Sequence, residues 1–254
     1  MDGGLIHPAE FFLPPWKGER KVDTVPALLV ALVTGWFTVL VARQYFRNHR
    51  PNLFFWSVSL AFSCLASLAY SLSLWQTPHS GAMFLIYYLL GALWMPALMG
   101  LGSLGLVFRP RTVNIVATIV CILGLIGSVL LLKSPVLAAP LQALHGGAGT
   151  GVVQQGSWLV FLIVLNSFGA IAVFLVAIMS AVKAAKKQAP ARFFYGNLWL
   201  AIGILIISAA GSAARLGLPQ LFWITMLIGW VLTYFGYRLL TPAAVSRLTL
   251  GTAS

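Results

Sequence analysis

Acidic residues are almost missing from this sequence. Its 254 residues include 16 Lys and Arg but only 4 Asp and Glu, which leaves a formal net charge of +12. All the acids lie at or before Asp23, and none occurs from Thr24 to Ser254. Proton relays through the membrane, acid–base catalysis by carboxylates and metal sites built on Asp or Glu all need such groups. We therefore expect none of these chemistries after Asp23.

Cysteine and histidine are scarce as well. Cys64 and Cys121 each fall within an apolar run, so we expect small buried side chains and no disulfide framework. The histidines all fall in predicted tails or loops, at His7, His49, His79 and His145. Haem ligation inside a bundle, histidine-rich di-iron centres and a retinal Schiff base (segment 221–240 has no Lys) are thereby excluded. We expect no cofactor, no metal and no enzymatic activity.

Charge is low overall, and apolar residues dominate. Charged residues make up 8% of the chain and hydrophobic residues 60%, with a mean hydropathy of +0.93, whereas soluble domains carry about 25% charged residues. A bilayer-spanning helix needs about 20 apolar residues. Seven segments qualify, namely 26–45, 53–75, 81–108, 113–133, 157–182, 194–214 and 221–240. We predict one all-α transmembrane domain, a seven-helix bundle over 26–240.

The basic residues predict the orientation of this bundle. They concentrate in alternate connections, at Arg43, Arg47, Arg50, Arg109, Arg111, Lys183, Lys186, Lys187 and Arg192. Cytoplasmic loops carry such an excess, so the N-terminus is expected outside and the C-terminus inside. Residues 1–25 then form an extracytoplasmic tail without the pattern of a signal peptide, and 241–254 a cytoplasmic tail. The basic face is expected to contact anionic lipid headgroups; its scattered charges do not favour nucleic acid.

Two stretches of the chain suggest an internal repeat. The second span opens with Pro51-Asn-Leu-Phe-Phe-Trp56, and the sixth opens with Pro190-Ala-Arg-Phe-Phe-Tyr195. A similar offset relates the third and seventh spans. The chain could thus contain two parallel three-helix units joined by the fourth span, an arrangement found in transporters. The alternative is convergence, because helices entering the membrane favour proline followed by interfacial aromatic residues.

Polar and aromatic groups within the predicted spans indicate where a ligand could bind. Our candidates are Tyr70, Tyr88, Trp94, Asn166 and Trp230. Asn166 is the most informative, since an amide in hydrocarbon needs hydrogen-bond partners. Those partners are either neighbouring helices, which is the favoured interpretation, or a ligand.

Four further features leave alternatives open. Pro96 removes a helical hydrogen bond inside the third span and predicts either a static kink or a hinge. The 134–156 connection is interpreted as a flexible spacer, or else as a cover over a site. Small residues at Gly100, Gly102, Gly105, Gly124, Ser128, Ser208 and 211–213 predict close helix packing or a homo-oligomer contact. Arg215 is expected to reach lipid headgroups, to pair with Glu19 or Asp23, or to bind an anionic ligand.

Several stretches resemble a group of uncharacterised bacterial multi-pass membrane proteins. They run from Tyr87 to Gly105 (YYLLGALWMPALMGLGSLG), from Arg43 to Arg47 (RQYFR) and from Gly196 to Gly211. The chain is also loosely similar to seven-span sensory input regions of bacterial kinases, although we expect no output domain here. The resemblance implies the seven-span topology and a bacterial inner membrane, and it supplies no catalytic residue.

Together these observations predict a non-enzymatic multi-pass membrane protein. We expect it to bind a neutral or apolar ligand, or a membrane-protein partner, as a receptor-like or accessory subunit. A second copy of the chain is the other partner considered. The alternative is a facilitator of a neutral solute that is not proton-coupled through carboxylates.

Overall fold

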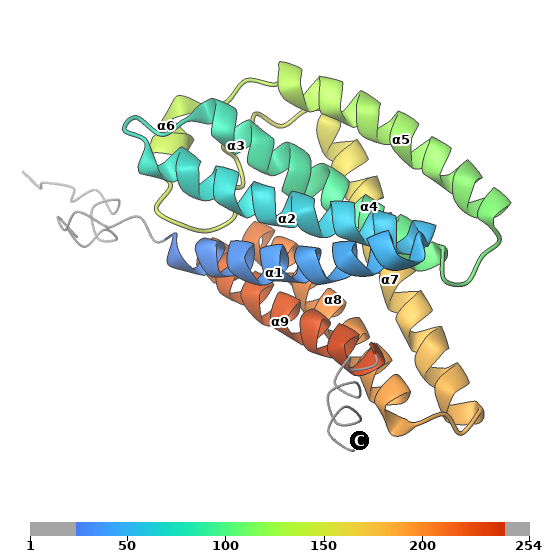
Figure 1. Cartoon of the computed structure of the whole chain (residues 1–254). Coiled ribbons are helices and arrows are strands. Elements are labelled where there is room, and N and C mark those ends of the chain that lie inside the picture. Colours follow the sequence, from blue (N-terminus) through green and yellow to red (C-terminus); the bar gives the residue numbers. More distant parts are fainter. Residues whose placement is uncertain (1–23, 242–254) are drawn as a thin grey trace, which may run out of the picture.

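The computed structural model describes residues 24–241, which form a bundle of helices (Figure 1). Seven helical spans are long and apolar enough to cross a membrane. They are α1 (Val25–Asn48), α2 (Pro51–Trp75), a third span from Gly81 to Leu104, α5 (Pro110–Lys133), α7 (Trp158–Lys186), α8 (Ala191–Arg215) and a last span from Pro219 to Leu240. The predicted seven-span, all-α, multi-pass membrane protein is confirmed over these residues. The third span ends four residues earlier than predicted, because 105–107 already form a turn.

Proline and left-handed residues set the ends of several helices. Pro51 and Pro110 are the first residues of α2 and α5, where a helix has no use for the missing N–H and the fixed φ suits it. α1 ends at His49, whose φ of 49° lies in the left-handed region and whose N–H donates to the Tyr45 carbonyl at 2.7 Å. These local signals explain why the spans lie close to their predicted positions.

The third span is not a uniform α-helix. It consists of α3 (Gly81–Tyr87), a π-helical turn η2 (Tyr88–Trp94) and α4 (Met95–Leu104). Pro96 is the second residue of α4, directly after the π-helical segment. Proline cannot donate to the carbonyl four residues before it, and π-helical segments mark such local departures from the α pattern. The irregularity predicted at Pro96 thus spreads over the two preceding turns.

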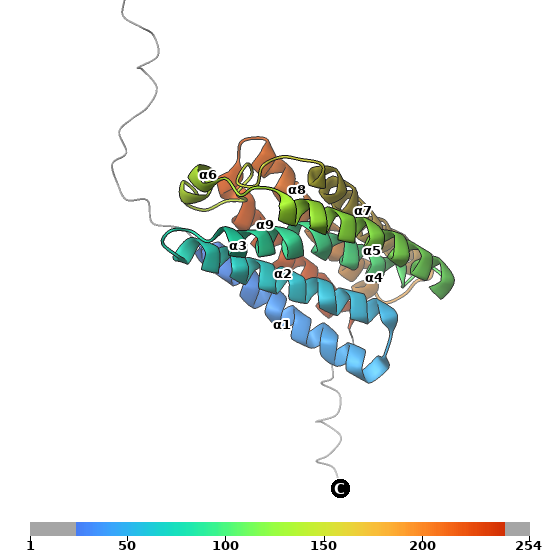
Figure 2. The ribbon, with the colours of Figure 1, turned by 90° about the horizontal axis from the view of Figure 1, so that it is seen from above.

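Six of the spans pack against one another in cyclic order. The order is α1, α2, the third span, α7, α8 and the last span, whose helix α9 (Phe222–Leu240) returns to α1. α5 lies outside this ring and contacts α7, η2 and α4 (Figures 1 and 2). The six-membered ring is therefore the structural unit, and α5 lies along its side.

Small residues allow the closest helix contacts, as predicted for several positions. A Cβ on Gly102 would lie 2.1 Å from Trp56, and one on Gly124 would lie 2.5 Å from Trp94. Cys64 and Cys121 are both free thiols. Cys64 is half-buried, but Cys121 is exposed, so its expected burial is wrong. Its helix, α5, turns one side away from the bundle.

The connections gather at two opposite ends of the bundle. One end carries the connections from α1 to α2, from α4 to α5 and from α7 to α8, and we call it the basic end. All the residues of the predicted basic face lie there and are exposed, namely Arg43, Arg47, Arg50, Arg109, Arg111, Lys183, Lys186, Lys187 and Arg192. The opposite end, which carries residues 134–156, is the loop end. Apart from 24–25 and 241, the two predicted tails lie outside the described residues.

The loop between α5 and α7 is folded against the loop end. It contains α6 (Ala138–Gln142) and an isolated antiparallel bridge between Val136 and Val153. Val152 and Val153 are buried in the hydrophobic core, and Leu137 N–H donates to the Val152 carbonyl at 2.8 Å. The favoured interpretation of this segment as a flexible spacer is wrong, because its apolar residues take part in the core.

Candidate functional site

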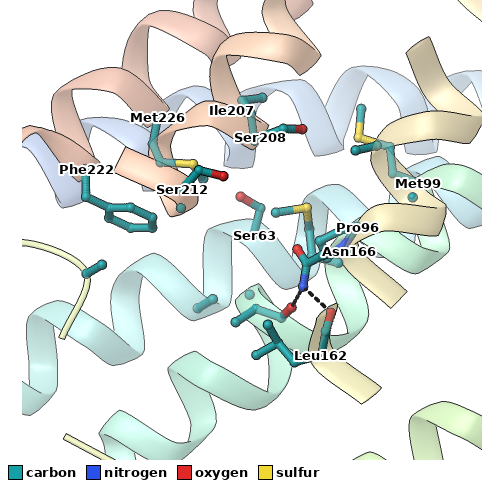
Figure 3. A pocket seen from close by; sticks show the side chains of 18 of the residues that line it. Ser63, Pro96, Met99, Leu162, Asn166, Ile207, Ser208, Ser212, Phe222 and Met226 are labelled. Atoms are coloured by element: carbon teal, nitrogen blue, oxygen red, sulfur yellow. Dashed lines mark hydrogen bonds between the residues drawn. The ribbon is translucent and has the colours of Figure 1, made fainter. Parts of the chain in front are cut away.

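A cavity of about 350 Å³ lies inside the ring of spans (Figure 3). α2, the third span, α7, α8 and α9 supply its walls, and Ala148 and Thr150 of the loop reach it at the loop end. Along α8 its lining runs from Ile204 to Arg215, a length of about 16 Å at the helical rise of 1.5 Å per residue. The cavity therefore extends from the loop end to a depth of about half the 30 Å hydrocarbon core.

The structure brings together three of the predicted site residues. Tyr88, Asn166 and Trp230 all line the cavity, from η2, α7 and α9. Tyr70 and Trp94 do not reach it. Trp94 faces α5 instead, where its Nε1–H donates to Ser128 Oγ at 2.9 Å. Tyr70 is fully buried behind the wall, with its ring centroid 4.6 Å from that of Trp223, which does line the cavity.

Asn166 bonds to the helix that Pro96 interrupts. The Asn166 Nδ2 amide donates to the carbonyl of Leu162 in its own helix, at 2.8 Å, and to the carbonyl of Ala92 across the cavity wall (Figure 3). Ala92 lies four residues before Pro96, which has no N–H to offer to that carbonyl. The amide therefore supplies a donor that proline removes. The favoured prediction for Asn166, hydrogen bonding across helices, is confirmed.

An aromatic cluster closes the cavity toward the loop end. Tyr87 and Tyr88 both line the cavity, and the ring of Phe84 lies 5.4 Å from that of Tyr87. Trp223 packs on the same group, with its centroid 5.7 Å from Tyr87. Such tilted and edge-to-face pairs add about 0.5–1.5 kcal/mol each beyond area burial. The cluster gives this end of the cavity a rigid wall.

The aromatic cluster also anchors the loop through its polar atoms. The Tyr87 hydroxyl donates to the Ala148 carbonyl at 3.3 Å, and the Tyr88 hydroxyl donates to the Gly149 carbonyl at 3.2 Å. Trp223 Nε1–H donates to the Gly147 carbonyl at 3.1 Å. Three consecutive loop carbonyls are thus held by side chains of the third span and α9. The 134–156 loop covers the cavity from above.

Trp230 presents a donor without a partner among the described residues. Its side chain is fully buried and lines the cavity, and its Nε1–H has no acceptor within residues 24–241. Leaving a buried donor unsatisfied costs about 1–3 kcal/mol. A bound group with an acceptor atom at this wall would remove that cost.

Serines at helical spacing form part of the lining that we had not singled out from the sequence. Ser63 and Ser67, one turn apart on α2, both line the cavity. Nearby, Ser59 Oγ donates to the carbonyl of Met95 at 2.7 Å and ties α2 to the start of α4. The spacing of four residues in an apolar span was the available signal, since it puts the hydroxyls on one face.

The small residues of α8 are not packed as predicted. Ser208 and Ser212 are exposed and line the cavity, together with Gly211. A Cβ on Gly211 would meet no atom within 4 Å. The packing interpretation of this stretch is therefore wrong. The exposed Ile163 of α7 lines the same space from the other side, so the cavity opens sideways between the loop-end halves of α7 and α8.

Among residues 24–241, one charged side chain lines the cavity. Arg215, the last residue of α8, lies at its loop end and within electrostatic range of Tyr88. Because residues 24–241 contain no Asp or Glu, no described carboxylate can pair with it. The pairing with Glu19 or Asp23 that we considered falls outside the described residues. Over the same range, no group of His, Cys, Asp and Glu could hold a metal ion.

Comparisons with known proteins add no assignment. No protein-family model matches the chain, and neither curated proteins nor solved structures give a significant match.

Proposed function

We propose that this protein is a non-enzymatic membrane protein that binds an apolar ligand in the cavity between α7 and α8. It would act as a receptor-like component or as an accessory subunit of a larger membrane assembly. The cavity carries the proposal, because its volume of about 350 Å³ falls within the 300–1,000 Å³ typical of small-molecule sites. Apolar walls with a few polar groups are also typical of such sites.

The polar groups of the wall support a ligand with an acceptor atom. The Trp230 Nε1–H is the one such buried donor in the wall that lacks a partner among residues 24–241. The Asn166 side-chain amide, by contrast, donates both of its hydrogen bonds to backbone carbonyls. We therefore assign Asn166 to holding the wall together, and propose that the wall opens at Trp230, whose side chain has no exposed surface, so that its N–H reaches the ligand.

The membrane and orientation are part of this proposal. We place the basic end in the cytoplasm of a bacterium and the loop end outside its inner membrane. The exposed Arg and Lys residues of the basic end support this, because cytoplasmic connections carry such an excess and meet anionic headgroups. The resemblance of the third span to bacterial multi-pass proteins favours the same location. The cavity then faces the outer leaflet.

Filling the cavity tests the proposal. The native protein would be purified in mild detergent, and mass spectrometry would identify any retained lipid, pigment or protein. Gly211→Phe should remove the retained small molecule, since Gly211 lines the cavity and has free space at its Cβ. Ala209→Phe is the matched control, because Ala209 is exposed on the same helix and does not line the cavity. A ligand retained equally by both variants would contradict the proposed site.

A facilitator of a neutral solute is the second candidate. Its support is the cyclic packing of the six spans. Going around the ring, α1, α2 and the third span follow one another in chain order, and α7, α8 and the last span then do the same. This is the order expected of two parallel three-helix units with α5 as the linker. Solute flux into proteoliposomes that persists after collapse of the proton gradient would favour this candidate. Flux that depends on the gradient would contradict it.

A further inference from the structure

The one charged side chain that residues 24–241 contribute to the cavity lies at one end of it. Arg215 is at the loop end, and the wall toward mid-bilayer is formed by apolar side chains such as Met99, Val173 and Ile204. A guanidinium is always protonated and offers five donors in a fork that matches carboxylate and phosphate groups. The cavity therefore has a cation at its loop end and a mainly apolar interior, in which the polar groups of the lining, such as the hydroxyl of Ser63, carry no charge.

The charge of Arg215 is not matched within the described chain. No carboxylate occurs among residues 24–241, and Arg215 is exposed at its helix end. Its position also suits a cation, because the carboxyl end of a helix carries partial negative charge. That partial charge does not replace an anion in forming bidentate hydrogen bonds. An anionic group that approaches from the lipid would find this guanidinium accessible.

The length of the cavity agrees with the depth of one leaflet. The α8 lining from Ile204 to Arg215 measures about 16 Å, and half of a hydrocarbon core is about 15 Å. The side opening between α7 and α8, where Ser208 and Ser212 are exposed, gives access from the bilayer. An acyl chain could thus enter sideways while its headgroup stays at the membrane surface.

We propose that the ligand is an anionic amphiphile, with its carboxylate or phosphate head on Arg215 and its acyl chain between α7 and α8. This inference rests on the proposed function and refines it, because the part of the ligand that fills the cavity stays apolar and only the head at Arg215 carries charge. A free fatty acid and a lysophospholipid share the required chemistry. A ligand of either kind reaches the site from the leaflet at the loop end.

The test compares amphiphiles that differ only in their heads. Binding of palmitate, palmitoyl lysophosphatidylglycerol and hexadecanol to the full chain in detergent would be measured by native mass spectrometry and titration calorimetry. Arg215→Gln should weaken the two anionic probes about tenfold or more, since hydrogen bonds to charged groups are strong. It should leave hexadecanol unchanged. Arg215→Lys should restore part of the loss. The lipid that binds more tightly distinguishes the carboxylate from the phosphate.

Two further variants separate this inference from the proposed function. Lys133→Gln removes an exposed charge at the loop end, outside the cavity lining, and should change no probe. Gly211→Phe should abolish binding of all three. If Arg215→Gln leaves palmitate and the lysophospholipid unchanged while Gly211→Phe abolishes them, the anionic head is refuted and the cavity stands. If Gly211→Phe also has no effect, the cavity is not the binding site and both proposals fail.

Discussion

A methyl group placed on Gly169 would lie 2.1 Å from the carbonyl oxygen of Pro96. The backbones of α7 and α4 therefore touch at the cavity wall. Gly100 extends the same contact by one turn, with a Cβ there 2.9 Å from the Gly169 Cα. Because α7 is held so closely against α4, the space left inside the ring lies on the side of α8.

We expect Gly169→Ala to force α7 and α4 apart and to destabilise the fold by about 1–3 kcal/mol, the usual cost of overpacking. Gly211→Ala is the matched control, since both are glycines within long spans and a Cβ on Gly211 meets nothing within 4 Å. The control should be neutral or stabilising by up to about 1 kcal/mol, from helix propensity alone. Thermal unfolding in detergent measures both. Equal Tm values for the two variants would show that the Gly169 contact is not tight.

The bond from Asn166 to the Ala92 carbonyl predicts coupling with Pro96. Asn166→Ala should cost about 0.6–1.7 kcal/mol, the range of interhelical hydrogen bonds in membranes. In a Pro96→Ala background the cost should shrink, because the new N–H at position 96 can donate to Ala92. A double-mutant cycle of unfolding free energies measures the difference. An identical cost in both backgrounds would mean that Asn166 does not compensate for the proline.

Anchoring of the loop predicts where local opening occurs. Tyr87→Phe, Tyr88→Phe and Trp223→Phe, combined, remove the three side-chain donors to Gly147, Ala148 and Gly149. Each bond contributes about 0.5–1.5 kcal/mol, so hydrogen exchange over 147–153 should become faster. Exchange in α1 should stay unchanged. Slow exchange throughout the loop in the triple variant would assign its order to the buried Val152 and Val153 alone.

The proposed orientation predicts accessibility of the two ends. In a background without Cys64 and Cys121, a membrane-impermeant maleimide added to intact cells should label His145→Cys and leave Gln188→Cys unlabelled. Both positions are exposed, at the loop end and the basic end respectively. Labelling of both after the membrane is opened is the control. The reverse pattern in intact cells would place the basic end outside.

The spans could be predicted because their signals are local. Runs of about 20 apolar residues, bounded by prolines such as Pro51 and Pro110, fix where each helix begins, whatever its neighbours do. Close packing at Gly102 and Gly124 could also be anticipated. The wrong packing prediction at Gly211 shows the limit of such reasoning. A small residue permits a close helix contact, but it does not determine whether another helix packs against it. That depends on how far α7 and α8 diverge.

The candidate site was only partly predictable for the same reason. Tyr88, Asn166 and Trp230 were identified by residue type and depth, and they do meet at one cavity. Trp94 is also an aromatic residue within a span, but it ends the π-helical segment before Pro96. Its side chain points to α5, where it bonds to Ser128, and not into the cavity. The folded loop was missed because its order comes from tertiary contacts, namely the burial of Val152 and Val153 and the hydrogen bonds from Tyr87, Tyr88 and Trp223.

Within residues 24–241, α5 packs mainly against α7, η2 and α4, and it is not a member of the six-helix ring. Its effect is on the direction of the chain, since α4 ends at the basic end and α7 begins at the loop end. Without residues 110–133, α7 would begin at the basic end. α7, α8 and α9 would then cross the membrane in the opposite direction, with Lys183 and Lys187 at the loop end. A peripheral helix of this kind sets the direction of the three helices that follow it, although it contributes little to the packing between them.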